Sequence, residues 1–551
     1  MNRMTRLAAA LAAATATVLA LSACAPQSNE VDLASYQNQT IEWGSCDSEW
    51  FVEDTRRSVE FERAEVDCGT ILAPAGYGTR LDAPDYKIAM MRTKASGTKI
   101  GTLFINPGGP GGSGIGQLQT SSFPTEILDA YDIVGFDPRG VEHSGFADGS
   151  KIKCSNATDF ATYWVKESSP ENDDQYIANL VLSNTHTNKC VKDNPYWYTM
   201  TTANVVQDLE LMRGVITGDA GLNFLGSSYG TTIAAAYVST FPEHIGHIIL
   251  DSPTSNEPTS IERAVEQEKT FEANLMRWIK GYAAHAKMTV AQVKQLLLDI
   301  RQWGDDDQLI GFAGTQVVDP DTGTFRSNEA LYLRGVKVLA YLPAADAQEA
   351  FNAAIDDLAK DKWNGTFEWM ALSLDGYDPT PLQNRTKYSA KDLIRDNSYE
   401  VMMIVNELDV DWPAFSDEQS DEYDARTREA APFWSKLNDD PSGFTYEGEA
   451  EYVDFADFAK KDDAIPDPPA TTPVRTNTSG KGVLVVGSRY ESVTPFKFAQ
   501  TTAKQLKSPL VAFEGSIHAP VAGFDNKCLN QILVDYLIND LLPADGTSCK
   551  P

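Results

Sequence analysis

The hydrophobic and polar positions of the chain follow two rhythms. In its first half and again near its end, short apolar runs alternate with longer amphipathic stretches. The apolar runs predict β-strands at 86–92, 101–105, 131–136, 223–225, 247–250, 482–486 and 509–513. Between them, Val205, Leu209, Met212 and Ile216 recur at helical spacing and predict one buried helix face. Strands that alternate with helices indicate an α/β fold, with a mostly parallel sheet covered by helices on both sides.

From about residue 254 the rhythm becomes mainly helical. Amphipathic segments at 261–284, 290–303 and 344–360 predict helices, and an acidic, proline-rich stretch at 409–478 is expected to be irregular. The alternation returns at residue 482 and closes with a helix through residues 529–537. We therefore expect a core of residues 46–253 and 479–551, interrupted by a helical cap and irregular insertion at 254–478.

The first 45 residues carry export signals. Arg3 and Arg6 precede an apolar run at 7–21, which is short for a membrane span, so residues 1–23 are predicted to be a signal peptide. A cysteine directly after Leu-Ser-Ala resembles the bacterial lipobox, which implies cleavage before Cys24 and lipid attachment to its sulfur. Residues 24–45 would then be the lipid anchor and a tether. The alternative is an ordinary secretory signal in which Cys24 is incidental.

These features predict a cell-envelope lipoprotein on the outer face of the cytoplasmic membrane, bound there through its lipid alone; release from the cell is the alternative. The chain of 551 residues has a formal charge of −32, and loss of Arg3 and Arg6 with the signal makes it −34. So acidic a protein is a poor partner for nucleic acid or for an anionic membrane face.

Six cysteines remain besides Cys24, which in an exported protein indicates three disulfides. They fall into three local pairs along the chain, so we predict the bridges Cys46–Cys68, Cys154–Cys190 and Cys528–Cys549. No Cys-x-x-Cys motif or histidine cluster accompanies them, so no metal site and no cofactor are expected.

The sequence Gly226-Ser-Ser-Tyr-Gly230 fits a nucleophile elbow. This Gly-x-Ser-x-Gly pattern exposes its serine when a strand precedes it and a helix follows. An apolar run ends at the motif, and the small-residue segment 231–240 suits a tightly packed helix. The pattern predicts an α/β-hydrolase fold with Ser228 as the nucleophile. The alternative is a Gly/Ser-rich turn with no chemistry.

A serine nucleophile needs a base and an acid, which follow it in the order acid, then histidine, in α/β-hydrolases. Glu491 follows the strand predicted at 482–486, and His518 follows the strand predicted at 509–513. His143 is the rival base. Asp251, which ends the strand after the nucleophile strand, is the rival acid.

The oxyanion hole requires two backbone N–H groups. One is expected from Tyr229, directly after the nucleophile, and the other from Gly109, in the glycine-rich loop 106–114 after an early strand. Residues 109–114 also match the Gly-x-Gly-x-x-Gly dinucleotide fingerprint. We discount nucleotide binding, because the elbow needs this loop as its partner.

Four motifs in order resemble one known family, the actinobacterial tripeptidyl aminopeptidases, which are secreted or lipid-anchored relatives of the proline iminopeptidases. They are 106–114 (NPGGPGGSG), 131–140 (YDIVGFDPRG), 226–230 (GSSYG) and 493–495 (VTP), and the segment 536–549 with its cysteine matches as well. The likeness covers about residues 40–253 and 480–551. It implies a serine exopeptidase that acts on peptides with free N-termini. Two departures stand out: the family usually has Asp in place of Glu491, and commonly a cysteine near 401–409, where this chain has none.

An aminopeptidase must bind the ammonium group of its substrate, which carboxylates do best. Glu407 and Asp409 in the cap region are the candidates. The predicted function is release of short peptides, by the resemblance tripeptides, through an acyl-enzyme on Ser228. The alternatives are a carboxylesterase or lipase of the same fold, and a non-catalytic binding lipoprotein.

Overall fold

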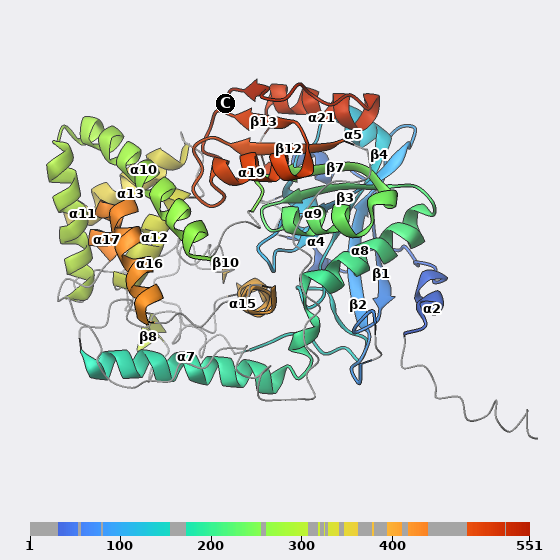
Figure 1. Cartoon of the computed structure of the whole chain (residues 1–551), viewed down its shortest axis with the longest axis horizontal. Coiled ribbons are helices and arrows are strands. Elements are labelled where there is room, and N and C mark those ends of the chain that lie inside the picture. The colour runs from blue at the N-terminus through green and yellow to red at the C-terminus, as the bar shows by residue number, and fades with distance from the viewer. Residues whose placement is uncertain are drawn as a thin grey trace, which may run out of the picture.

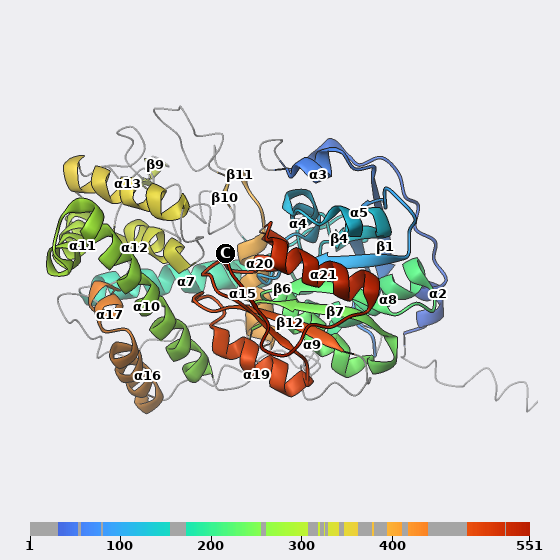
Figure 2. The ribbon, with the colours of Figure 1, turned by 90° about the horizontal axis from the view of Figure 1, so that it is seen from above.

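The computed structural model describes residues 31–52, 57–78, 81–154, 172–254, 260–306, 318–319, 324–325, 329–340, 346–361, 377–378, 394–409, 417–438, 482–523 and 525–551. An α/β core and a helical cap lie next to each other, with helix α15 (Ser398–Asp409) between them in both views (Figures 1 and 2).

The core is built on one twisted sheet. Its strands are β1 (Val66–Ala73), β2 (Tyr86–Thr93), β3 (Gly101–Asn106), β4 (Tyr131–Phe136), β5 (Gly145–Phe146), β6 (Leu222–Ser227), β7 (Ile245–Asp251), β12 (Val483–Ser488), β13 (Leu510–Phe513) and β14 (Ser548–Cys549). The order is β1-β2-β4-β3-β6-β7-β12-β13-β14, with β5 on β2. From β4 to β14 in this order, each strand is parallel to its neighbours. Strand β2 is antiparallel to both β4 and β1. The predicted mostly parallel sheet is confirmed, and β1, β5 and β14 are additions.

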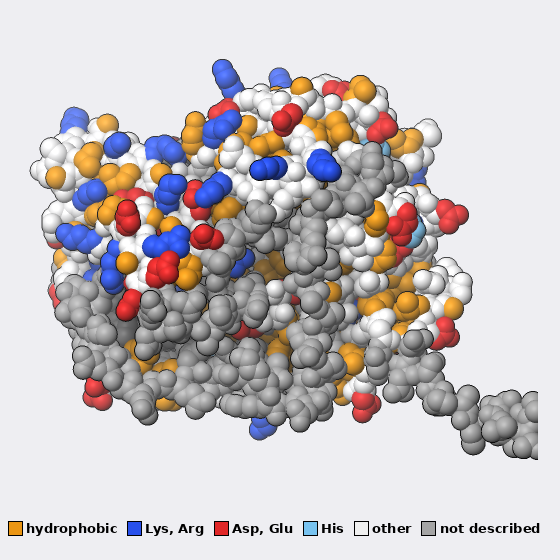
Figure 3. All heavy atoms as spheres, in the orientation of Figure 1, with side chains coloured by type: hydrophobic (Ala, Val, Ile, Leu, Met, Phe, Trp, Pro, Cys, Tyr) orange, Lys and Arg blue, Asp and Glu red, His pale blue; other side chains and the backbone are white. Residues whose placement is uncertain are grey.

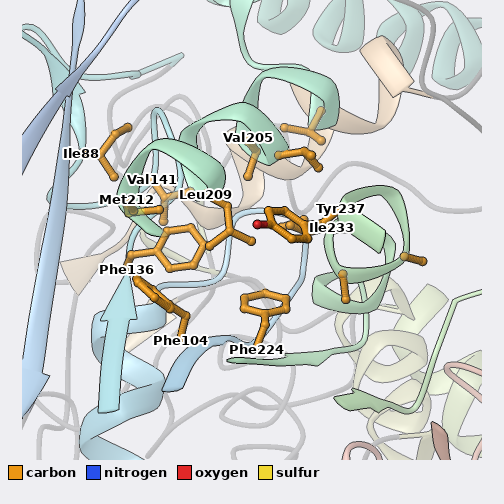
Figure 4. Close-up of a cluster of buried hydrophobic side chains, with 14 of the residues drawn as sticks. Ile88, Phe104, Phe136, Val141, Val205, Leu209, Met212, Phe224, Ile233 and Tyr237 are labelled. Atoms are coloured by element: carbon orange, nitrogen blue, oxygen red, sulfur yellow. The ribbon is translucent and has the colours of Figure 1, made fainter. Parts of the chain in front are cut away.

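Successive residues of the central strands face two separate apolar clusters. On one face pack α8 (Thr202–Thr217), α9 (Gly230–Thr240) and α19 (Phe496–Leu506), and on the other α4 (Gly114–Thr120), α5 (Thr125–Ala130) and α21 (Lys527–Asn539). Figure 4 shows Val205, Leu209 and Met212 of α8 packed toward the aromatic rings of Phe104 and Phe136. The helix face predicted from spacing is therefore confirmed, and both faces of the sheet are covered.

The cap has an apolar core of its own. Its helices are α10 (Ser260–Ala286), α11 (Val290–Asp305), α12 (Glu329–Lys337), α13 (Asp346–Asp361), α16 (Asp417–Ala430) and α17 (Pro432–Asn438). Buried residues on them form one cluster that includes Leu275, Ile300, Tyr332 and Trp434. Two strand pairs, β8 (Val318–Asp319) with β9 (Thr324–Phe325) and β10 (Tyr377–Asp378) with β11 (Ile394–Arg395), lie in the inserted region.

The three amphipathic helices predicted in the cap are confirmed, but the irregular stretch predicted at 409–478 is wrong over residues 417–438. That segment forms α16 and α17, because Phe433, Trp434 and Leu437 enter the apolar core of the cap. Residues 410–416 and 439–478 of that stretch lie outside the described part. Lys and Arg side chains lie among Asp and Glu over the described cap helices, so the negative charge is interspersed with positive charge there (Figure 3).

The end of the predicted tether belongs to the folded core. Residues 33–37 form α2 (Leu33–Gln37), and the hydroxyl of Tyr36 donates to Asp85 at 2.9 Å. Ile41 and Trp43 pack against the core, and Gly44 pairs with Cys68. The tether predicted for residues 24–45 is thus wrong from residue 31 onward, because these side chains find partners on distant strands. Among the described helices, none has the length and hydrophobicity needed to cross a bilayer.

All three predicted disulfides are confirmed: Cys46–Cys68, Cys154–Cys190 and Cys528–Cys549. The first fastens the N-terminal segment to β1, and the second joins residue 154 to helix α7 (Asp173–Asp193). The third ties α21 to β14. The short helices α3 (Val59–Glu62) and α20 (Pro520–Gly523) complete the described α-helices.

Candidate active site

The three residues predicted to form a catalytic triad lie beyond the carboxyl ends of parallel strands. Ser228 follows β6, Glu491 follows β12 and His518 follows β13. In the sheet β6 pairs with β7, β7 with β12 and β12 with β13. The carboxyl ends of adjacent parallel strands lie at the same edge of the sheet, and ligands bind at this edge in open α/β sheets.

The turn at Ser228 has the geometry of a nucleophile elbow. Ser228 has a φ of 54°, a left-handed conformation that costs energy for a residue with a side chain. The turn is possible because position 226 is glycine: a Cβ atom there would lie 2.2 Å from the carbonyl oxygen of Gly230. The N–H of Ser228 donates to the carbonyl oxygen of Asp251 at 2.9 Å, which fastens the turn to the end of β7.

His518 and Glu491 form a hydrogen-bonded pair. Nδ1 of His518 contacts Oε2 of Glu491, whose side chain has no exposed surface. The Oγ1 atom of Thr494 lies 3.5 Å from the same nitrogen. Burial by itself lowers the pKa of His518, but the charges of Glu491 and Asp251 and the hydrogen bond to Glu491 outweigh it and raise the pKa above its ordinary value. A carboxylate at Nδ1 leaves Nε2 as the nitrogen that can accept a proton from a nucleophile.

Asp251, the alternative acid, makes a different hydrogen bond. It is fully buried at the end of β7, and its Oδ2 atom accepts from the N–H of Val521, at the start of α20, at 2.9 Å. The carboxylate hydrogen-bonded to Nδ1 of His518 is that of Glu491, which favours Glu491 as the orienting acid.

The rival base His143 belongs to another cluster. Its Nδ1 atom lies 3.0 Å from Oδ2 of Asp137, and its ring centroid is 4.9 Å from that of Trp50. Burial lowers the pKa of His143, but the bond to Asp137 outweighs this and raises it. These contacts explain His143 as a packing residue.

The glycine-rich loop after β3 lies against the elbow. Oδ1 of Asn106 accepts from the N–H of Gly108 at 3.0 Å. A Cβ atom at Gly108 would lie 2.5 Å from the carbonyl oxygen of Ser227 and 2.6 Å from the nitrogen of Tyr229. The two backbones can therefore touch only because residue 108 is glycine. The loop therefore packs against the elbow, as predicted from the sequence.

The two predicted oxyanion donors are both available in this arrangement. Within the described part of the chain, neither the N–H of Gly109 nor that of Tyr229 donates a hydrogen bond. Tyr229 caps the N-terminal end of α9, where backbone N–H groups and the helix dipole favour negative charge.

Helix α15 connects the insertion to both sides of this site. The start of the helix packs on the glycine-rich loop, because a Cβ atom on Gly111 would lie only 2.3 Å from the carbonyl oxygen of Ser398. Asn397 and Glu142 exchange two hydrogen bonds of 2.9 Å there. Burial, with the nearby charge of Asp396, raises the pKa of Glu142 to about 7.

At the other end of α15, Asp409 reaches the residue next to the nucleophile. Its Oδ1 atom accepts from the N–H of Thr202 at 3.0 Å, and its Oδ2 atom contacts the hydroxyl of Thr202. The hydroxyl of Tyr229 lies 3.5 Å from Oδ2. Burial raises the pKa of Asp409 to about 6. Glu407, the second candidate for amine binding, is partly buried on the same helix.

The structure adds residues that the motifs did not indicate. Ser252 donates to Glu491 at 2.5 Å, and the hydroxyl of Ser488 bonds to the carbonyl oxygen of Ile517, next to His518. Both are serines at strand ends, which is too common a pattern to have singled them out from the sequence. In the described part of the chain, no group of three or more His, Cys, Asp or Glu residues could hold a metal ion.

Two known protein families match separate segments of the chain, and each segment contains part of the candidate triad. Residues 101–289, which contain Ser228, match the family described as alpha/beta hydrolase fold. Residues 457–549, which contain Glu491 and His518, match the family described as TAP-like protein. The two matches thus include all three residues that the sheet carries to one edge.

Three curated relatives cover nearly the whole chain. The chain is 28% identical over 525 residues to serine protease Hip1 of Mycobacterium tuberculosis, covering 93% of this chain and 91% of the relative. It is 25% identical over 544 residues to tripeptidyl aminopeptidase of Streptomyces lividans, covering 93% and 87%. It is 27% identical over 539 residues to carboxylesterase B of Mycobacterium tuberculosis, covering 92% and 90%.

Proposed function

Because the chain belongs to the α/β-hydrolase family of serine peptidases with a TAP-like C-terminal part, we propose that it is an exported aminopeptidase that releases short peptides from free N-termini. The observation that carries the proposal is the pairing of His518 with a buried Glu491 at the sheet edge where a strained turn presents Ser228. Tripeptides are the expected products, by similarity to the tripeptidyl aminopeptidase relative.

The proposed reaction runs through an acyl-enzyme. Oγ of Ser228 attacks the carbonyl carbon of the scissile peptide bond, and Nε2 of His518 takes the hydroxyl proton. The carbonyl oxygen becomes an oxyanion that accepts hydrogen bonds from the N–H groups of Gly109 and Tyr229. His518 then gives its proton to the leaving amine as the peptide bond breaks. Water, deprotonated by His518, attacks the acyl-enzyme, and the short peptide leaves as a carboxylate while Ser228 recovers its proton.

Asp409 and Glu407 are the proposed acceptors for the substrate ammonium group. Asp409 supports this role by position, because it touches Tyr229, the residue that follows the nucleophile. A buried carboxylate with a pKa near 6 is partly protonated in weak acid and is charged at neutral and higher pH. Binding of a cationic amine should therefore weaken as the pH falls below about 6.

A substrate panel tests the proposal. The purified protein is given chromogenic tripeptide amides with free and with acetylated N-termini, single amino-acid amides and short acyl esters. The proposal expects the free tripeptides to be cleaved with the highest kcat/KM and the acetylated ones to be poor substrates. Equal cleavage of free and acetylated tripeptides would reject the exopeptidase assignment.

The second candidate is a carboxylesterase, because one relative of similar identity is named carboxylesterase B. In the same panel, fast hydrolysis of short acyl esters with no cleavage of any peptide amide would select it. Both candidates use the same three residues. The panel therefore distinguishes the substrate class, and its result does not change the assignment of the catalytic residues.

We also propose that the protein is a lipoprotein of the cell envelope, anchored through Cys24 in its Leu-Ser-Ala-Cys sequence. Fractionation of cells that express the unmodified chain and Cys24→Ser tests this. The unmodified chain should sediment with membranes and the variant should be released. An unmodified chain found wholly in the soluble exported fraction would reject the anchor.

A further inference from the structure

Ser252 occupies an unusual position directly after β7. It is fully buried and has a φ of 56°, a left-handed backbone conformation that glycine adopts far more easily than serine. Its N–H donates to the carbonyl oxygen of Val486 on β12 at 2.9 Å, so the backbone is held between two strands. For backbone geometry alone, glycine would serve better here, which raises the question of what the hydroxyl does.

The hydroxyl of Ser252 lies between two parts of the site that are far apart in sequence. Its Oγ atom is 2.5 Å from Oε1 of Glu491 and 3.0 Å from the backbone nitrogen of Ala519, the residue after His518. A carboxylate can only accept a hydrogen bond and a backbone N–H can only donate one. The proton of Ser252 therefore points to Glu491, and a lone pair of Oγ accepts the N–H of Ala519.

We propose that Ser252 is a positioning residue of the catalytic site, whose single hydroxyl fixes both the acid Glu491 and the loop that carries His518. This inference rests on the proposed function, in which His518 is the base and Glu491 its orienting acid. Each oxygen of Glu491 then has one task, because Oε2 holds Nδ1 of His518 while Oε1 is held by Ser252.

The need for such a tether follows from the length of the acid. Glutamate has one more rotatable bond than aspartate, so its carboxylate has more freedom to lose when it orients a histidine. Ser252 removes the added freedom of Glu491 by holding the oxygen that does not face His518.

Replacement of Ser252 by glycine separates positioning from folding. Ser252→Gly removes the hydroxyl and also relieves the left-handed strain, whereas Ser252→Ala removes the hydroxyl and keeps the strain. We expect both variants to lose roughly 10- to 100-fold in kcat with little change in KM, the scale expected for a displacement of about 1 Å in a catalytic group. We also expect the glycine variant to unfold at a urea concentration no lower than that of the alanine variant.

Lys507→Gly is the matched control. Lys507 also has a left-handed conformation, with a φ of 52°, but it caps the exposed end of α19 away from the site. It should shift the urea midpoint without changing kcat. Normal kcat in a folded Ser252→Gly protein would overturn the inference, and so would a loss that Lys507→Gly shares.

A double-mutant cycle tests the route of the effect. If Ser252 acts through Glu491, Ser252→Ala should cost far less in a Glu491→Gln background than in the unmodified protein. Equal costs in the two backgrounds would reject the inference even if Ser252→Gly did not fold. Failure of the proposed function would look different, because the unmodified protein would then cleave no tripeptide amide in the substrate panel.

Discussion

The identity of the catalytic acid can be tested by changing Glu491 and Asp251 one at a time to their amides. Glu491→Gln keeps the shape of the side chain but removes the charge beside His518. It also places an NH2 group where a carboxylate oxygen stood, and both oxygens are engaged, by Nδ1 of His518 and by the hydroxyl of Ser252. Whichever way the amide turns, one of the two donors loses its acceptor.

The expected losses differ by orders of magnitude. If the NH2 group faces Nδ1, His518 is pushed into the wrong tautomer, a change that costs about 10⁴-fold in kcat in a serine-protease triad. This corresponds to about 5 kcal/mol of transition-state stabilisation, at about 1.4 kcal/mol for each factor of ten. The bond that Asp251 accepts from Val521 can be made equally by an amide oxygen, so Asp251→Asn should lose about tenfold or less.

The pH profile gives a second measurement. His518 must be unprotonated to act as a base, and its pKa lies above the ordinary value of 6.5 because of Glu491 and Asp251, despite burial. In the unmodified protein kcat/KM should therefore rise with pH along an acid limb centred above 6.5. The limb should move to lower pH in Glu491→Gln, and less far in Asp251→Asn.

Steady-state assays with a cleavable tripeptide amide between about pH 5 and 9 provide both measurements, with circular dichroism to show that each variant is folded. If Asp251→Asn lost most of its kcat while Glu491→Gln kept a kcat near that of the unmodified protein, Asp251 would be the acid. An acid limb that stays in place in Glu491→Gln would contradict the electrostatic argument for His518.

Three further predictions concern the surroundings of the triad. Gly108→Ala should lose about 10²- to 10³-fold in kcat, measured by steady-state kinetics, because its Cβ would strike Ser227 and Tyr229 beside the oxyanion donors. Burial lifts the pKa of Asp409 from 3.8 to about 6, so the stabilisation by protonated Asp409 is complete below pH 3.8 and is lost as the pH rises through 6. Above pH 6, Asp409→Asn should therefore be more stable to urea than the unmodified protein, by up to about 3 kcal/mol. The same variant should lose peptidase activity. No pH-dependent difference in urea midpoints would contradict it. Loss of the Cys528–Cys549 bridge should cost about 2–4 kcal/mol in unfolding free energy, measured with urea, and no change would show that α21 is held without it.

The parts of the site that could be predicted from sequence are those carried by local patterns. A strand that runs into Gly226-Ser-Ser-Tyr-Gly230 indicates an elbow, and a histidine after a late strand indicates the base. The chain also matches enzyme family models and relatives that are named as peptidases, so the alternative of a non-catalytic binding protein no longer stands. The sequence left both Glu491 and Asp251 open as the acid, and the contact of Glu491 with Nδ1 of His518 favours Glu491.

The parts that could not be predicted depend on contacts between distant segments. Ser252 resembles any serine after a strand until the fold brings Glu491 to its hydroxyl, 239 residues away. Asp409 is one of many acidic residues in its region, and only the packing of α15 gives it Thr202 as a partner. Residues 31–45 are polar enough to suggest a tether, yet Tyr36 and Trp43 find partners on the core.

The central claim is that Ser228 is the nucleophile of a serine peptidase, and a fluorophosphonate probe tests it most directly. Intact-mass analysis of the labelled protein, followed by peptide mapping, should show one adduct on Ser228 and a complete loss of tripeptide release. Ser228→Ala should take no label and should lose on the order of 10⁶-fold in kcat while its urea midpoint stays near that of the unmodified protein. Normal tripeptide release by folded Ser228→Ala, or a single adduct on another residue that abolishes activity, would contradict the account.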